Sequence, residues 1–96
     1  KAITINSHLA EAYVNRANLY TLEIDREKAL EDYTAAININ PQLSAGYNNR
    51  CILLYRMGRL SEALEDAQKA CEIAPTDFKG FNNRAFLEFQ LDFSYI

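Results

Sequence analysis

The sequence predicts an all-α fold in which antiparallel helix-turn-helix repeats stack side by side into a solenoid. The first observation is that residue types return every 34 residues, as at Tyr13, Tyr47 and Phe81. The second is the helical spacing of the apolar residues within each unit. The third is the proline that closes each unit, Pro41 and then Pro75. A fixed period of this length is typical of arrays in which each repeat buries its apolar face on its neighbours.

The apolar spacing and the residues that interrupt it predict five helices, near 10–23, 27–39, 44–57, 61–73 and 77–92. Each second helix of a pair is expected to stop before the closing proline, because the residue before a proline is pushed out of helical geometry. Gly58 is the expected left-handed residue at a helix end. Ser44, and either Thr76 or Asp77, are expected to cap the helices that follow them.

The 34-residue period divides residues 1–96 into parts of one array. Residues 1–9 match the end of a preceding repeat, 10–43 and 44–77 are two whole repeats, and 78–96 is the first helix of a further repeat. The chain is therefore predicted to be a fragment, with apolar side chains uncovered at its ends. Such ends predict self-association, or exchange of helices between molecules.

Composition and charge narrow the classes of partner. The chain is 49% hydrophobic and 24% charged, which is typical of a globular domain. A net charge of −3 and a pI near 5.0 argue against nucleic acid, which needs a concentrated basic surface. No apolar run is long enough to span a membrane. Cys51 and Cys71 fall on core positions, so they are predicted to be buried free thiols in an intracellular, cytoplasmic setting.

Few residues are suited to catalysis. His8 is the only histidine, and no other metal-ligating residue stands near it at a useful spacing. The acidic pairs Glu31-Asp32 and Glu65-Asp66 recur with the repeat, which favours helix surface and ion pairing over a catalytic dyad. The three glycines form no phosphate-binding loop. The sequence therefore predicts no enzyme activity, no metal site and no cofactor.

The recurring pattern resembles the tetratricopeptide repeat, whose signature is an aromatic, a large, a small and an aromatic residue, then alanine, an aromatic and a closing proline. The resemblance covers essentially the whole chain. It implies a right-handed superhelix whose first helices line a concave groove, and it implies no particular partner. The first repeat fills the signature with Tyr13, Arg16, Ala17, Tyr20, Ala29, Tyr33 and Pro41, and the second with Tyr47, Arg50, Cys51, Leu54, Ala63, Ala67 and Pro75.

By this resemblance, side chains on the first helices are candidates for binding a partner peptide. Asn15, Asn49 and Asn83 recur at the repeat spacing, and an amide both donates and accepts, so it can pair with an extended peptide backbone. The other interpretation is that asparagine is simply polar enough for a wet groove. Tyr55 and Phe86, together with Phe89, are the expected apolar anchors. The predicted groove residues are Asn15, Asn18, Asn49, Tyr55, Lys79, Asn83 and Phe86.

Three arginines, Arg16, Arg50 and Arg84, stand where the family usually has leucine. We interpret them as structural ion pairs with Asp32 and Asp66, because a partly buried arginine needs a partner and its fork suits bidentate pairing. The alternative is a cationic row that faces a ligand. Arg84 has no aspartate in its own repeat, so its expected partner is Asp66 on the preceding helix.

A narrower resemblance is to the carboxylate clamp of co-chaperones that hold the acidic C-terminal tails of heat-shock chaperones. Asn18, Asn49 and Lys79 agree with the clamp. Val14 stands where a lysine belongs, and Asn83 stands where an arginine belongs. Charge-assisted bonds supply much of the affinity for a terminal carboxylate, so the two missing cations argue against a working clamp.

Together these observations predict a protein-interaction module that binds a peptide or segment of a partner protein in the concave groove. Two other functions stay open. One is a structural or assembly element that self-associates through exposed helix ends. The other is a targeting appendage of a larger, multidomain protein.

Overall fold

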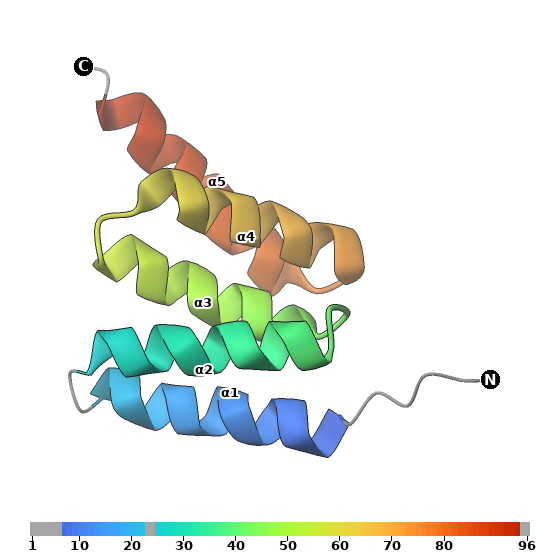
Figure 1. Cartoon of the computed structure of the whole chain (residues 1–96). Coiled ribbons are helices and arrows are strands. Elements are labelled where there is room, and N and C mark those ends of the chain that lie inside the picture. The colour runs from blue at the N-terminus through green and yellow to red at the C-terminus, as the bar shows by residue number, and fades with distance from the viewer. Residues whose placement is uncertain (1–6, 23–24, 95–96) are drawn as a thin grey trace.

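The computed structural model describes residues 7–22 and 25–94, and within these ranges it contains five α-helices and no strand. Successive helices run back and forth and stack along one direction (Figure 1). The predicted all-α repeat solenoid is confirmed. The helices are α1 Ser7–Leu22, α2 Arg26–Ile39, α3 Ser44–Arg56, α4 Leu60–Ile73 and α5 Phe78–Ser94.

Helix α1 begins earlier than the sequence indicated, at Ser7 rather than near residue 10. Ala10, Val14 and Ala17 are buried at i, i+4 and i+7 and form one stripe facing the core. Because Ala10 already anchors the helix in the core, one further turn forms before it. Residues 7–9 thus belong to α1, whereas the period assigns them to a preceding repeat. The remainder of that assignment, residues 1–6, lies outside the described residues.

The signals that end helices act as predicted. Helices α2 and α4 end at Ile39 and Ile73, two residues before their prolines. At the end of α3, Gly58 has a φ of 81° and the N–H of Arg59 donates to the carbonyl of Leu54 at 2.9 Å. This is a left-handed helix cap, which satisfies carbonyls that the helix itself leaves open.

The signals that begin helices are less uniform. Asp77 precedes α5, and its Oδ1 accepts a hydrogen bond from the N–H of Lys79 at 3.0 Å, as a cap does. The prediction for Ser44 is wrong, because Ser44 is the first residue of α3 and Leu43 precedes it without a side-chain cap. Leu43 packs against the core instead. Burial of its side chain takes precedence over a polar cap at this position.

Small side chains allow the helices to pack closely. Ala29 on α2 and Ala63 and Ala67 on α4 are fully buried. Leu53 lies in a core cluster with residues of α1 and α2, and Leu87 lies in a cluster with residues of α3 and α4. Each of these two leucines fills the space between a first helix and the helices before it, which links one repeat to the next.

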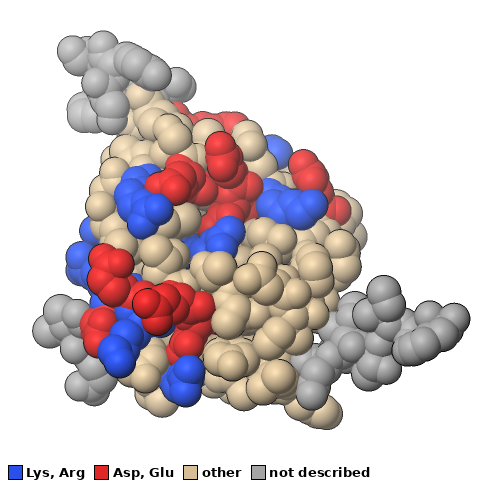
Figure 2. Space-filling model, in the orientation of Figure 1, with Lys and Arg blue, Asp and Glu red and all other residues tan. Residues whose placement is uncertain are grey.

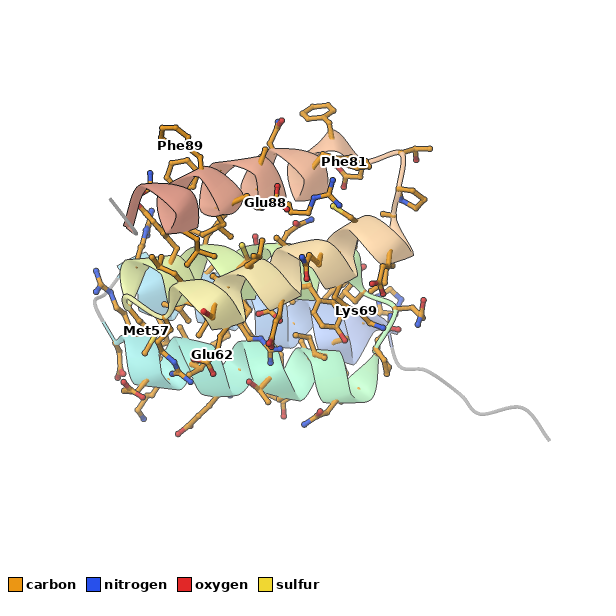
Figure 3. The ribbon with its side chains drawn as sticks, turned by 90° about the horizontal axis from the view of Figure 1, so that it is seen from above. Met57, Glu62, Lys69, Phe81, Glu88 and Phe89 are labelled. Carbon is orange, nitrogen blue, oxygen red and sulfur yellow. The ribbon has the colours of Figure 1, made fainter. Side chains whose placement is uncertain are left out.

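The first helices of the units lie on one side of the array. Within the described ranges, α1 contacts α3 and α3 contacts α5, whereas α2 and α4 make no close backbone contact with each other. The array is therefore tighter on the side of α1, α3 and α5 than on the side of α2 and α4. Seen from above, α2 and α5 lie at opposite edges with α4 between them (Figure 3). The inner, tighter side carries the candidate groove.

Candidate functional site

An apolar cleft opens between α3 and α5 on the inner side of the array. Its volume is about 240 Å³. The rings of Tyr55 and Phe86 meet edge to face across it, with centroids 5.1 Å apart and planes at 75°. Ile52 and Phe86 are exposed large hydrophobic side chains. The cleft is lined by Cys51, Ile52, Tyr55, Arg56, Asn83, Phe86 and Leu87. Such a combination of apolar walls and a few polar groups suits the side chain of a bound peptide.

The three recurring asparagines lie in different environments, and one of them reaches the cleft. Asn83 lines the cleft, and its Nδ2 donates to Oδ1 of Asn48 at 3.2 Å. Asn49 is half-buried, and Asn15, on α1, is exposed. Asn48 is itself buried, so the bond from Asn83 satisfies a polar group inside the α3–α5 interface. Asn83 therefore supports the packing of the two helices in addition to facing the cleft.

Asn18 also takes part in an internal hydrogen bond. The hydroxyl of Tyr33, which is buried on α2, donates to Oδ1 of Asn18 on α1. This bond satisfies the hydroxyl of a tyrosine whose ring lies in the core. Only the structure reveals this role, because residues 18 and 33 are joined by the antiparallel pairing of α1 and α2.

The positions that matter for a carboxylate clamp differ in their exposure. Lys79 is exposed in the first turn of α5. Val14, which stands where the clamp has a lysine, is buried in the core cluster of α1, α2 and α3 and does not face the groove. Its apolar side chain packs against other helices because a branched aliphatic residue gains more from burial than from exposure. The cation expected at that position in a clamp is absent.

Two arginines of the predicted row make bidentate ion pairs with buried aspartates. Arg16 donates from Nε and Nη2 to the carboxylate of Asp32 at 2.7 and 2.9 Å. Arg50 donates in the same way to Asp66 at 2.8 and 2.9 Å, and its Nη1 reaches Oγ1 of Thr34 at 3.2 Å. Hydrogen bonds to the carboxylates, with the attraction of their charge, raise the pKa of both guanidinium groups. Both arginines therefore hold a second helix against its first helix.

The prediction that Arg84 pairs with Asp66 is wrong. Both carboxylate oxygens of Asp66 accept hydrogen bonds from Arg50. Arg84 lies instead near Glu88, one turn along α5, with Nε and Oε2 4.0 Å apart. The aspartate of α4 faces its own repeat, where the geometry of the helix pair brings the arginine of α3 within reach.

The cysteines are free and buried. The thiol of Cys51 lies behind the apolar cleft, where burial, and then the charge of Asp66, raises its pKa to about 12. A raised pKa keeps the thiol protonated, which is opposite to what a nucleophilic cysteine needs. Cys51 thus acts as a small apolar side chain, and Cys71 is buried as well.

Charge on the outer side is mixed. Acidic and basic side chains lie intermixed on part of the face that carries α2 and α4, and the face in view has no large basic area (Figure 2). Among the described residues, no group of three or more His, Cys, Asp or Glu side chains is arranged to hold a metal ion. The same ranges contain no helix with the length and apolar character needed to cross a membrane.

Comparison with known proteins identifies the family. Residues 10–43 and residues 44–77 each match the tetratricopeptide repeat. The chain therefore belongs to the tetratricopeptide repeat family. No curated protein sequence matches it.

Solved structures with the same fold include domains that hold peptides. The second TPR of Spaghetti (RPAP3) bound to the HSP90 peptide SRMEEVD has a TM-score of 0.85 at 24% identity, over 91% of this chain and 81% of that one. The first TPR of the same protein, bound to the same peptide, has a TM-score of 0.89 at 21% identity, over 94% and 71%. The TPR2AB-domain:pHSP90 complex of yeast Sti1 has a TM-score of 0.84 at 26% identity. That match covers 91% of this chain and 34% of the yeast chain.

Proposed function

We propose that this chain is a protein-interaction module that binds a segment of a partner protein along the inner groove of α1, α3 and α5. An apolar side chain of the partner enters the cleft between Tyr55 and Phe86. Asn15 and Asn49, with Lys79 at the start of α5, contact the backbone and polar groups of the same segment. The role is binding rather than catalysis, and the two free thiols favour a reducing, intracellular location.

The observation that carries the proposal is the exposed aromatic cleft on the inner side. Phe86 is 46% exposed, although large aromatic side chains are usually buried or placed at interfaces. Aromatic anchors in such clefts supply much of the energy of protein–peptide binding. The bound peptides of the RPAP3 and Sti1 domains support the proposal, because those domains have the same fold.

A selection experiment tests the proposal without a known partner. Peptides are selected from a displayed library on the immobilised chain, and the affinity of each enriched peptide is measured by fluorescence anisotropy. Phe86→Ala is expected to weaken binding at least about tenfold, because it removes one wall of the cleft. The double variant Asn15→Ala/Asn49→Ala is expected to weaken it less. Asn83 is left intact, because Asn48 depends on it.

Phe81→Ala is the matched control, since Phe81 is a similarly exposed phenylalanine of α5 that does not line the cleft. Circular dichroism verifies that each variant is folded. Peptides that bind wild type and Phe86→Ala equally well would contradict the proposal. A loss of peptide affinity in Phe81→Ala as large as that in Phe86→Ala would also contradict it.

The missing clamp cations lead to a specific expectation for acidic C-terminal peptides. The peptide SRMEEVD is expected to bind with the same affinity whether its terminal carboxylate is free or amidated, because Val14 is buried and residue 83 is an asparagine. A marked preference for the free carboxylate would show that other cations complete a clamp.

A second candidate function is self-association through the ends of the array. Leu19 on α1 and Phe78 on α5 are highly exposed, and they lie on the first and last described helices. Light scattering over a range of protein concentrations tests this candidate, and a strict monomer at high concentration excludes it.

A further inference from the structure

The apolar cleft between α3 and α5 is lined by one charged side chain, that of Arg56. This arginine lies in the last turn of α3 and borders the cleft together with Tyr55 and Phe86. Among the described residues no carboxylate lines the cleft, although the whole chain carries a net charge of −3. The charge at the cleft is therefore opposite in sign to the charge of the protein.

The guanidinium of Arg56 is not engaged inside the molecule. Within residues 7–22 and 25–94 it is exposed and makes no hydrogen bond or ion pair. The other arginines of these ranges each have a carboxylate or a backbone carbonyl as a neighbour: Arg16, Arg26, Arg50, Arg59 and Arg84. All the donors of the Arg56 fork are therefore free to bind a ligand.

The backbone of Arg56, in contrast to its side chain, is held in place. Its carbonyl accepts a hydrogen bond from Nη1 of Arg26 at 3.3 Å. The next residue, Met57, donates its N–H to the carbonyl of Leu53 at 3.0 Å. The Arg56 side chain thus extends from a fixed helix end beside the cleft, which limits the ordering that binding requires.

The stacking of the repeats does not explain a cation at this position. Leu22, Arg56 and Gln90 share one repeat position, and the other two are uncharged. A cation in the last turn of a helix does interact favourably with the helix dipole. That role concerns the stability of α3, and it gives no preference for one peptide over another.

We propose that the groove binds partner segments in which an aspartate or glutamate lies within two residues of the apolar anchor, and that Arg56 binds its carboxylate. The inference rests on the proposed function, because it adds a second contact to the same cleft. An extended segment advances about 3.3 Å per residue, so a carboxylate one or two positions from the anchor lies within reach of the long arginine side chain. The guanidinium fork matches a carboxylate in bidentate geometry.

The carboxylate in this inference belongs to a side chain and not to the end of the partner chain. Arg56 is not one of the clamp positions, and it stands seven residues after Asn49 on α3. At two clamp positions the chain has the buried Val14 and the uncharged Asn83. The preferred segment can therefore lie inside the partner chain, with no free terminus.

A charge-swap experiment tests the inference on the peptides selected from the displayed library. The tightest peptide whose binding depends on Phe86 is synthesised with acetyl and amide ends in three forms, which carry a carboxylate, the matching amide or a lysine beside the anchor. Each form is titrated by fluorescence anisotropy with wild type and with Arg56→Glu. The matched control is Lys28→Glu, which changes the net charge equally at an exposed position of α2 that does not line the cleft. Circular dichroism verifies that each variant is folded.

Wild type is expected to bind the carboxylate form at least about fivefold more tightly than the amide form. Arg56→Glu is expected to reverse the order in favour of the lysine form, and Lys28→Glu is expected to keep the order of wild type. Equal binding of the three forms to wild type, or the same order with Arg56→Glu, overturns the inference.

The two proposals fail in different ways. If binding depends on Phe86 and Arg56→Glu leaves the order of the peptides unchanged, the inference fails and the proposed function stands. If no selected peptide depends on Phe86, the proposed function fails, and the inference fails with it. Binding that requires a free terminal carboxylate overturns the inference alone, because the end of the partner chain would then supply the charge.

Discussion

Residues at the same repeat position contribute differently to stability because their neighbours differ. Arg50 reaches both Asp66 on the following helix and Thr34 on the preceding one, and only 21% of its side chain is exposed. Arg16 makes the same aspartate contact but is 57% exposed. Water screens an exposed pair much more than a buried one. The two ion pairs are therefore alike in geometry and unequal in their effect on stability.

Arg50→Ala is expected to lower the free energy of unfolding by about 2 kcal/mol, because it leaves the buried carboxylate of Asp66 without its main partner. Arg16→Ala, in a more hydrated pair, is expected to cost clearly less. Urea unfolding followed by circular dichroism at the helical band measures both. Equal losses for the two variants would mean that burial does not control the strength of these pairs.

At the scale of elements, the distance between adjacent helices depends on residues without side chains. Gly80 on α5 faces the backbone of α4, where a Cβ would lie 3.2 Å from the nitrogen of Cys71 and 3.2 Å from its Sγ. Gly46 occupies the equivalent position on α3, where the nearest atom is Cγ1 of the Ile37 side chain at 3.1 Å. A side chain can change rotamer, whereas a helix backbone moves only as a whole.

Gly80→Ala is therefore expected to destabilise the chain by about 1–3 kcal/mol through overpacking at the α4–α5 interface. Gly46→Ala is expected to be close to neutral, because the gain in helix propensity offsets the shift of Ile37. Thermal unfolding of the two variants at equal protein concentration makes the comparison. If Gly46→Ala unfolds at a lower temperature than Gly80→Ala, the close approach of Gly80 to the α4 backbone does not limit the stability of the chain.

At the scale of the whole molecule, position in the array determines burial. Leu19, Leu53 and Leu87 share one repeat position, yet Leu19 is 61% exposed while each of the other two is 1% exposed. Leu53 and Leu87 pack against the helices of the preceding unit. Leu19, on the first described helix, has no such cover. Stability contributed by a repeat thus depends on its interfaces as well as on its own helices.

Leu53→Ala is expected to cost about 3 kcal/mol, from lost burial and the cavity left behind. Leu19→Ala is expected to cost less than about 1 kcal/mol, because its side chain is already in contact with water. Denaturant midpoints for the two variants, with unchanged slopes, provide the measurement. A large effect of Leu19→Ala would indicate that another part of the molecule, or a second copy, covers it in solution.

Local features were readable from the sequence because their causes are local. Apolar spacing located the five helices of the described residues, prolines ended α2 and α4, and Gly58 ended α3. Ser44 failed as a cap because Leu43 gains more by packing into the core than a hydroxyl gains at the helix start. The start of α1 was misplaced for a similar reason, since Ala10 is anchored by other helices.

The candidate site could be outlined but not built from the sequence. The repeat spacing pointed to Asn83, and the resemblance to the tetratricopeptide repeat pointed to Tyr55 and Phe86, but nothing in the sequence indicated that α3 and α5 bring the two rings together. Neither did it reveal that Asn83 bonds to the buried Asn48, or that Val14 lies in the core. These facts depend on how one helix rotates against another, which side-chain packing across the repeats decides.

By itself, the sequence determined the 34-residue period, the all-α architecture and most helix ends, because periodicity and backbone sterics act within a few residues of the chain. The tertiary structure alone decided which copy of a recurring residue is covered. Asp66 turns to Arg50 and leaves Arg84 beside Glu88, and Leu19 is exposed where Leu53 is buried. Repetition makes the residues equivalent in sequence, whereas burial and pairing depend on neighbours, which differ along a finite array.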